Sequence, residues 1–151
     1  MYEADQADRQ GDIDWELVGP RDEARRQRAT EMLDQDIVHT AQDYYNAAMI
    51  FQHGTFGDTI SARRAFDLME RSLSLESAVP RGKWLRAAAW DRYLMYKGEP
   101  QWYGTQYRKL SAESPWILWE VDTTKVTDAE RAANDVPPLA EARARAEEMN
   151  R

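Results

Sequence analysis

The stretch WLRAAAWDRYLMYKGEPQWYGTQY, from Trp84 to Tyr107, decides the fold because it joins a very apolar helical segment to a dense cluster of polar loop residues. On a helical wheel, residues 84–96 leave no clean polar face, and a helix that is apolar almost all round lies in the interior of a protein. Gly98 favours an end to this helix, and Pro100 prevents it from resuming. We therefore predict a central, buried helix followed by a short loop.

An adjacent charged pair, Asp91 and Arg92, lies in the middle of this apolar segment. A charge in a protein interior is strongly destabilising unless it has a partner. The loop after the helix offers amide, phenol and hydroxyl groups at Gln101, Tyr103, Thr105 and Gln106. The sequence therefore predicts that the charged residues are drawn inside and meet the polar groups of the loop.

The composition excludes several classes of protein. A length of 151 residues suits one domain with a proper core, and the net charge of -7 disfavours nucleic acid and anionic membrane as partners. No apolar run approaches the roughly 18 to 20 residues that span a bilayer, and the acidic N-terminus does not resemble a signal peptide. The lack of cysteine excludes disulfides and thiolate chemistry. We expect a soluble, cytoplasmic domain, or the mature domain of a longer exported precursor.

The N-terminal half predicts a lead-in and three helices. Residues 1–19 show no sustained period and are expected to be partly ordered, and Pro20 is expected to open the first long helix. Thr40 and Asp43 resemble a capping box at the start of a second helix, which runs to His53. A third helix follows an Asp cap and is expected to pair with the second in antiparallel fashion.

The C-terminal part changes period after the loop. Aromatic and β-branched residues in 103–108 and 116–121 flank a turn-like segment and predict a β-hairpin, one face of which must lie on the helices. A capping box at Thr127 and the prolines Pro137 and Pro138 predict two further helices. The predicted fold is mainly α: a compact antiparallel helical bundle with tetratricopeptide-like helix pairs and a small β-hairpin near residues 103–121. Residues 20–151 are expected to form a single helical domain.

Several segments resemble one family of bacterial, mostly helical proteins that are sometimes described as tetratricopeptide-like. They are DQADR at 5–9, DYYNAAMIFQHG at 43–54, WLRAAAWDRYL at 84–94, PQWYGTQY at 100–107 and VTDAERAANDVPPLAE at 126–141. The resemblance covers nearly the whole chain and implies one bacterial helical domain. It implies no reaction, because the family carries no assigned activity.

The candidate site combines the end of the second helix, the central helix and the loop. Candidate catalytic residues are His53, Asp91, Arg92, Tyr103 and Gln106, and candidate ligand-binding residues are Gln52, Gln101 and Thr105. A histidine near a carboxylate can act as a general base, and an arginine with amide donors can bind an anionic or carbonyl oxygen. The alternative is that the charged residues satisfy helix ends and the backbone of the turn at Gly104, while His53 interacts with a helix dipole.

No metal site or cofactor is predicted. The chain has two histidines and no cysteine, so a metal site would need His39 or His53 with carboxylates, and no HExxH-like spacing occurs. The glycine patterns of serine hydrolases, phosphate-loop NTPases and dinucleotide-binding proteins are absent as well.

Two functions remain open from the sequence. The first is a protein-binding or scaffold domain with a groove lined by aromatic residues, namely Tyr44, Tyr45, Trp102 and Trp119. The second is a small enzyme or small-molecule binder that uses His53, Asp91, Arg92, Tyr103 and Gln106. The first is favoured because no complete catalytic constellation is visible, whereas the second is favoured because ionisable groups in an apolar helix are destabilising unless paired or used.

Overall fold

A computed structural model describes residues 1–76 and 78–151 of the chain. These parts form seven helices and one two-stranded antiparallel sheet, so the predicted mainly α fold with a small hairpin is confirmed. The elements are α1 (Tyr2–Ala7), α2 (Trp15–Asp34), α3 (Ala41–Gln52), α4 (Thr59–Leu75), α5 (Gly82–Tyr96), β1 (Tyr107–Arg108), β2 (Ile117–Leu118), α6 (Asp128–Ala133) and α7 (Leu139–Glu148). The tetratricopeptide-like character of the helix pairs stays a prediction.

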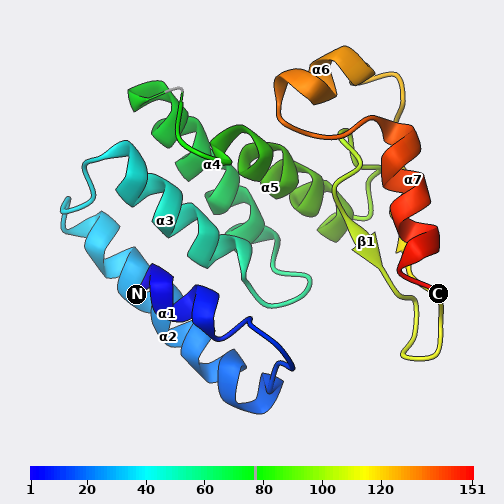
Figure 1. Cartoon of the computed structure of the whole chain (residues 1–151). Coiled ribbons are helices and arrows are strands. Elements are labelled where there is room, and N and C mark those ends of the chain that lie inside the picture. The colour runs from blue at the N-terminus through cyan, green and yellow to red at the C-terminus, as the bar shows by residue number, and fades with distance from the viewer. Residues whose placement is uncertain (77) are drawn as a thin grey trace.

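The helices α2, α3, α4 and α5 follow one another across the molecule, and the hairpin, α6 and α7 lie beyond α5 (Figure 1). The antiparallel pairing of α3 and α4 is confirmed at both ends. The Ser72 hydroxyl near the end of α4 donates a 2.7 Å hydrogen bond to the carbonyl of Ala41 at the start of α3. At the other end Gly54 lies so close to Ser61 that a Cβ added there would be 2.9 Å from the Ser61 Cβ.

The core is formed mainly by α3, α4 and α5, and alanines allow these helices to approach closely. Ala48, Ala65 and Ala89 are all fully buried. Larger apolar side chains from the same three helices fill the space around them, among them Ile50, Met69 and Leu85. The apolar wheel of the central helix therefore reflects two buried sides: one packs on α4 and the other meets the loop that follows α5.

Side-chain caps define where α3, α4 and α6 begin. Thr40 and Asp43 form the predicted capping box of α3, and Thr127 and Glu130 form that of α6. The carboxylate of Asp58 accepts a hydrogen bond from the Ser61 N–H at the start of α4. These contacts satisfy N–H groups that have no partner within a helix.

The predicted start of the first long helix at Pro20 is wrong. α2 begins five residues earlier at Trp15, where the Asp14 carboxylate accepts hydrogen bonds from the N–H groups of Glu16 and Leu17, and Pro20 lies inside the helix. Proline has no N–H to donate and is usually excluded from a helix interior, which explains the error. Residues 2–7 of the expected lead-in are also helical, as α1.

The chain from α5 to the hairpin positions the loop of residues 101–106. From the sequence, residues 77–82 with Pro80 are expected to connect the third helix to the central one; Ser77 of this connector lies outside the described residues, and α5 already begins at Gly82. Gly98 follows the end of α5 with φ 76°, a left-handed conformation that favours glycine. The hairpin pairs Tyr107 with Leu118, and α7 packs on β2.

In the described parts of the chain, no helix has the length and apolar character needed to cross a membrane.

Candidate functional site

Asp91 connects α5 to the loop of residues 101–106. Its side chain is 0% exposed, and its two carboxylate oxygens accept four hydrogen bonds. Oδ1 accepts from the backbone N–H groups of Trp102 at 2.8 Å and Tyr103 at 2.9 Å. Oδ2 accepts from the Thr105 N–H at 3.0 Å and from the Thr105 hydroxyl at 2.8 Å. Burial raises the pKa of Asp91, and these hydrogen bonds act against that rise.

Two buried glutamines join the loop to its surroundings. The Gln101 Nε2 donates to the carbonyls of Gln106 at 3.0 Å and Trp119 at 2.8 Å, and its Oε1 accepts from the Gln106 N–H at 2.8 Å. The Gln106 Nε2 donates in turn to the carbonyl of Ala88 on α5, at 3.2 Å. Side-chain amides thus bind the loop to Trp119, which follows β2, and to the central helix.

Arg92 links the loop to the C-terminal end of α3. Its Nε donates to the Gln106 Oε1 at 2.9 Å, and its Nη1 donates to the backbone carbonyl of Gln52. The last carbonyls of a helix carry the negative end of its dipole, and a guanidinium group there is favourable. Arg26 of α2 donates to the next carbonyl, that of His53, at 3.2 Å. Burial lowers the pKa of Arg92.

Arg131 on α6 completes the set of contacts, although the sequence did not identify it. Its side chain is 3% exposed, and it donates to the carbonyls of Tyr103 at 3.0 Å and Trp102 at 3.1 Å, and to the Asp128 carboxylate at 3.0 Å. Asp91 therefore accepts from the N–H groups of residues 102, 103 and 105 while Arg131 donates to the carbonyls of 102 and 103. We name Asp91, Arg92, Gln101, Gln106 and Arg131 the loop cluster.

His53 does not join the loop cluster. Its Nδ1 lies 2.8 Å from the Asp5 Oδ2, and Asp5, on α1, is 1% exposed. Asp5 also accepts hydrogen bonds from Arg9 at 2.9 Å and from Gln6 at 2.8 Å. From the sequence, this histidine is grouped with Asp91, whereas the carboxylate that it contacts comes from the N-terminal helix and lies 48 residues away in sequence.

Further ion pairs attach α1 and the segment that follows it to α2. Arg9 pairs with Asp22 at 2.5 Å, and Arg25 pairs with Asp22 at 3.0 Å and with Asp8. Burial raises the pKa of Asp5, whereas the hydrogen bond and charge of His53 and the charge of Arg9 lower it. The lowering effects together are larger, so the pKa of Asp5 lies below its ordinary value. Charge pairing therefore helps to hold this end of the chain on α2.

We expect Asp5→Asn to lower the free energy of unfolding by about 2 kcal/mol at pH 7, because it weakens a buried, charge-assisted network. A carboxylate with a lowered native pKa contributes stability above its unfolded pKa of about 3.8 and loses it as the pH falls through the native value. The difference between wild type and variant should therefore shrink in urea unfolding at pH 3. Asp12→Asn, at an exposed position, is the control and should change little at either pH.

The structure thus separates His53 from the other predicted site residues, which lie around the loop. Asp91, Arg92, Gln101, Thr105 and Gln106 meet around the loop. Tyr103 contributes its backbone N–H and carbonyl, and Gln52 contributes its carbonyl. Among the described residues, no hydrogen bond or ion pair joins His53 to Asp91, nor do Asp91 and Arg92 pair with each other.

The four aromatic residues of the predicted groove contact different parts of the molecule. Tyr45 is buried in the core against Tyr2, and Arg71 lies over the ring of Tyr44. Trp102 packs edge-on against Trp90 of α5, and the indole N–H of Trp119 donates to the carbonyl of Glu99. In the parts of the chain that the structure describes, no aromatic pair joins the two tyrosines to the two tryptophans.

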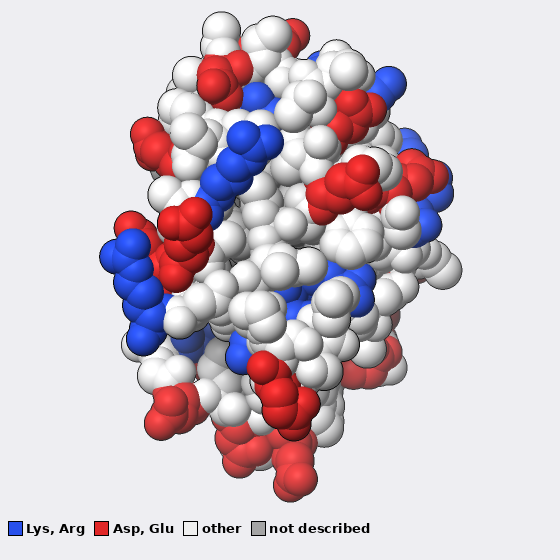
Figure 2. All heavy atoms as spheres, turned by 90° about the vertical axis from the view of Figure 1, so that its right-hand side faces the viewer, with Lys and Arg blue, Asp and Glu red and all other residues white. Residues whose placement is uncertain are grey.

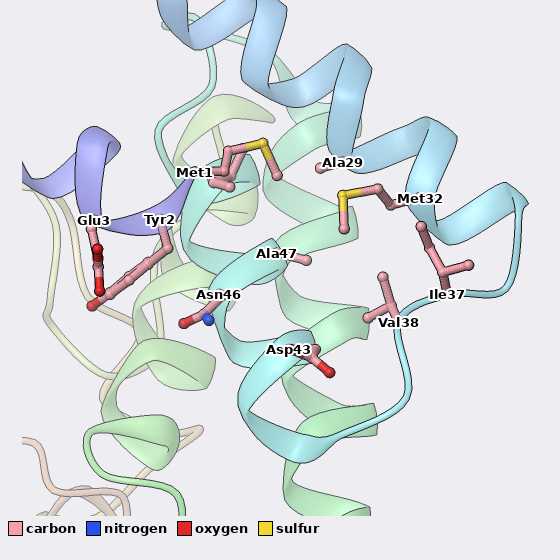
Figure 3. Close-up of a pocket in the computed structure, with 11 residues that line it drawn as sticks. Met1, Tyr2, Glu3, Ala29, Met32, Ile37, Val38, Asp43, Asn46 and Ala47 are labelled. Atoms are coloured by element: carbon pink, nitrogen blue, oxygen red, sulfur yellow. The ribbon is translucent and has the colours of Figure 1, made fainter.

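A pocket of about 310 Å³ opens between α1, α2, α3 and the α2–α3 connection, away from the loop cluster. Its apolar lining comes from Met1, Ala29, Met32, Ile37, Val38, Ala47 and Ile50, and its polar lining from Tyr2, Glu3, Asp43 and Asn46. Figure 3 shows Met32, Ile37 and Val38 beside the space between α2 and α3. We name it the α1–α3 pocket. Apolar pockets with a few polar groups are the usual form of a binding site.

A wider cleft of about 860 Å³ lies between α7, the loop and the start of α5. Charged side chains of α7 line it, including Glu141, Arg145 and Glu148, all of them exposed. On the face that carries α7, acidic and basic side chains are scattered between uncharged ones (Figure 2). Apolar residues such as Trp84, Val136 and Met149 line the same cleft beside these charged side chains.

Comparison with family models, curated proteins and solved structures finds no match for this chain. The resemblance to a bacterial helical family therefore stays a prediction. Among the described residues, no group of three or more His, Asp or Glu side chains is placed to hold a metal ion.

Proposed function

We propose that this chain is a protein-binding domain that accepts a large apolar side chain of a partner protein in the α1–α3 pocket. The observation that carries the proposal is an apolar cavity of about 310 Å³ with exposed apolar side chains at its mouth. Met1 and Ile37 are each 47% exposed and line the same pocket. Interface energy is concentrated where a large side chain of one protein fills a pocket of the other.

Methionines suit the pocket to this role. Met1 and Met32 supply flexible, polarizable thioethers that can adapt to the shape of an entering group. The floor, formed by residues such as Ala47 and Ile50, belongs to the packed core and is held by α3. A rigid floor with an adaptable rim favours a leucine, methionine or phenylalanine side chain as the anchor.

The loop cluster supports a structural role better than a catalytic one. A general base or an oxyanion site needs a polar group that faces a substrate. The polar groups of Asp91, Gln101 and Arg131 instead contact the backbone of residues 101–106 and 119. The alternative of a small enzyme that uses His53, Asp91, Arg92, Tyr103 and Gln106 therefore has less support than a binding domain.

The proposal is tested with Ile37→Asp, which puts a charge at the mouth of the pocket. Methyl groups of Met1, Met32, Ile37 and Val38 are followed by NMR during titration with capped peptides that carry Leu, Met or Phe between glutamines. We expect shifts confined to these methyls for wild type, and binding weakened at least about tenfold in the variant, since an unpaired charge disfavours an apolar contact.

Ile60→Asp is the matched control. Ile60 is 79% exposed on α4 and is not among the residues that line the pocket. Because both variants replace an isoleucine by an aspartate, they have the same net charge. It should bind the peptides as the wild type does. The proposal is wrong if peptide concentrations up to about 10 mM, equivalent to a binding free energy below about 3 kcal/mol, leave the pocket methyls unshifted.

A further inference from the structure

We propose that the partner segment bound in the α1–α3 pocket is basic, with Lys or Arg flanking the apolar anchor side chain. This inference rests on the proposed function and adds the chemical class of the partner. It follows from the charges at the edge of the pocket. When the anchor side chain is inside the pocket, the residues next to it in the partner lie at this edge.

The rim of the pocket is acidic. Glu3 on α1 and Asp43 on α3 line the pocket, and both residues are exposed. Of the described residues that line it, none has a basic side chain. The pocket is therefore lined by two carboxylates, with the Met1 ammonium group as a positive charge in the same lining, so that the carboxylates outnumber the cation in a chain whose net charge is -7. Complementary charge at such a rim favours a cationic partner and disfavours an acidic one.

The charge of Asp43 is secured by the cap of α3. Its Oδ2 accepts hydrogen bonds from the Thr40 hydroxyl at 2.7 Å and from the Thr40 N–H at 3.2 Å. The Thr40 hydroxyl is the main cause that holds the pKa of Asp43 below its ordinary value. Because both bonds go to one oxygen, Oδ1 can accept from a guanidinium or ammonium group of a partner while the capping box stays intact.

The arginines of α2 are held by ion pairs with carboxylates other than those of the rim. Arg25 of α2 pairs with Asp8, which follows the C-terminal end of α1, and with Asp22 of α2, and Arg28 pairs with Glu31 at 2.8 Å. The cations of α2 are thus engaged by other carboxylates. Glu3 forms part of the first turn of α1, one residue from Tyr2, which packs on Tyr45 and fixes the position of the helix.

Three capped hexapeptides test the inference: Gly-X-Leu-Phe-X-Gly with X as Arg, Gln or Glu, titrated into the wild-type chain at low salt with the pocket methyls as the readout. We expect the Arg peptide to bind about tenfold more tightly than the Gln peptide, and the Glu peptide more weakly still, as two partly exposed ion pairs would give. The preference should shrink as the ionic strength rises to about 0.5 M.

Variants locate the preference. Glu3→Gln and Asp43→Asn each remove one rim charge, and asparagine can still accept the hydrogen bonds of the cap. Each should reduce the preference for Arg over Gln about threefold, because each removes one of the two partly exposed ion pairs. Glu147→Gln removes one charge from the exposed side of α7, away from the pocket, and should leave the preference unchanged.

The outcomes separate the two proposals. Equal binding of the Arg and Gln peptides at the pocket methyls overturns the inference of a basic partner and leaves the proposed function standing. A preference for Arg that survives in the double variant Glu3→Gln/Asp43→Asn also overturns it. If none of the three peptides shifts the pocket methyls, the proposed function itself fails.

Discussion

Replacing Asp91 by alanine is expected to lower the free energy of unfolding by about 4 kcal/mol, because the change leaves several buried hydrogen-bond donors without a partner. The carboxylate is 0% exposed and accepts from the N–H groups of Trp102, Tyr103 and Thr105 and from the Thr105 hydroxyl. The methyl group of alanine accepts no hydrogen bond and leaves a cavity too. Urea unfolding followed by tryptophan fluorescence at pH 7 measures the loss.

Asp67→Ala is the matched control for this change. Asp67 lies on α4 with a side chain that is 53% exposed, and it pairs with Arg63, one turn away. Exposed pairs of this kind contribute less than about 1 kcal/mol. If Asp91→Ala costs no more than this control, the carboxylate does not hold the loop, and a functional role for it gains support.

Arg131→Met should cost about 3 kcal/mol and release the loop from α6, because a buried guanidinium group is replaced by a side chain with no donor. Methionine fills much of the same volume, so the loss reports on hydrogen bonds more than on packing. The carbonyls of Trp102 and Tyr103 lose their side-chain partner. Unfolding in urea measures the free energy, and amide NMR signals of residues 101–106 report on the loop.

The exposed Arg143 on α7 provides the control, as Arg143→Met. This change should cost less than about 0.5 kcal/mol and leave the amide signals of the loop in place. A loss of similar size in both arginine variants would mean that Arg131 acts through general charge, whereas unchanged loop signals in Arg131→Met would mean that α6 does not fix the loop.

The sequence predicted the inner part of the loop cluster for a physical reason. A carboxylate within an apolar helix must find donors, and the nearest donors in the chain follow a glycine that ends the helix. Asp91 and Gln106 accordingly meet in the expected region. The donors that Asp91 uses are mainly backbone N–H groups, and side-chain chemistry in the sequence does not reveal that.

The partners contributed by distant segments could not be predicted in the same way. Arg131 lies in a short helix with polar neighbours, where an arginine is ordinarily exposed, and Asp5 lies in a segment without sustained period. Their burial depends on which helices pack together, not on local pattern. The same holds for the α1–α3 pocket, because its walls come from three helices that meet only in the folded chain.

Hydrogen exchange of the loop amides in the wild-type chain tests the central claim most directly, namely that the loop cluster holds residues 101–106 as part of the fold. The account predicts that the amides of Trp102, Tyr103 and Thr105, which all donate to Asp91, exchange only through openings nearly as costly as global unfolding. Exchange at rates close to those of an unstructured peptide, with the core helices still protected, would contradict it.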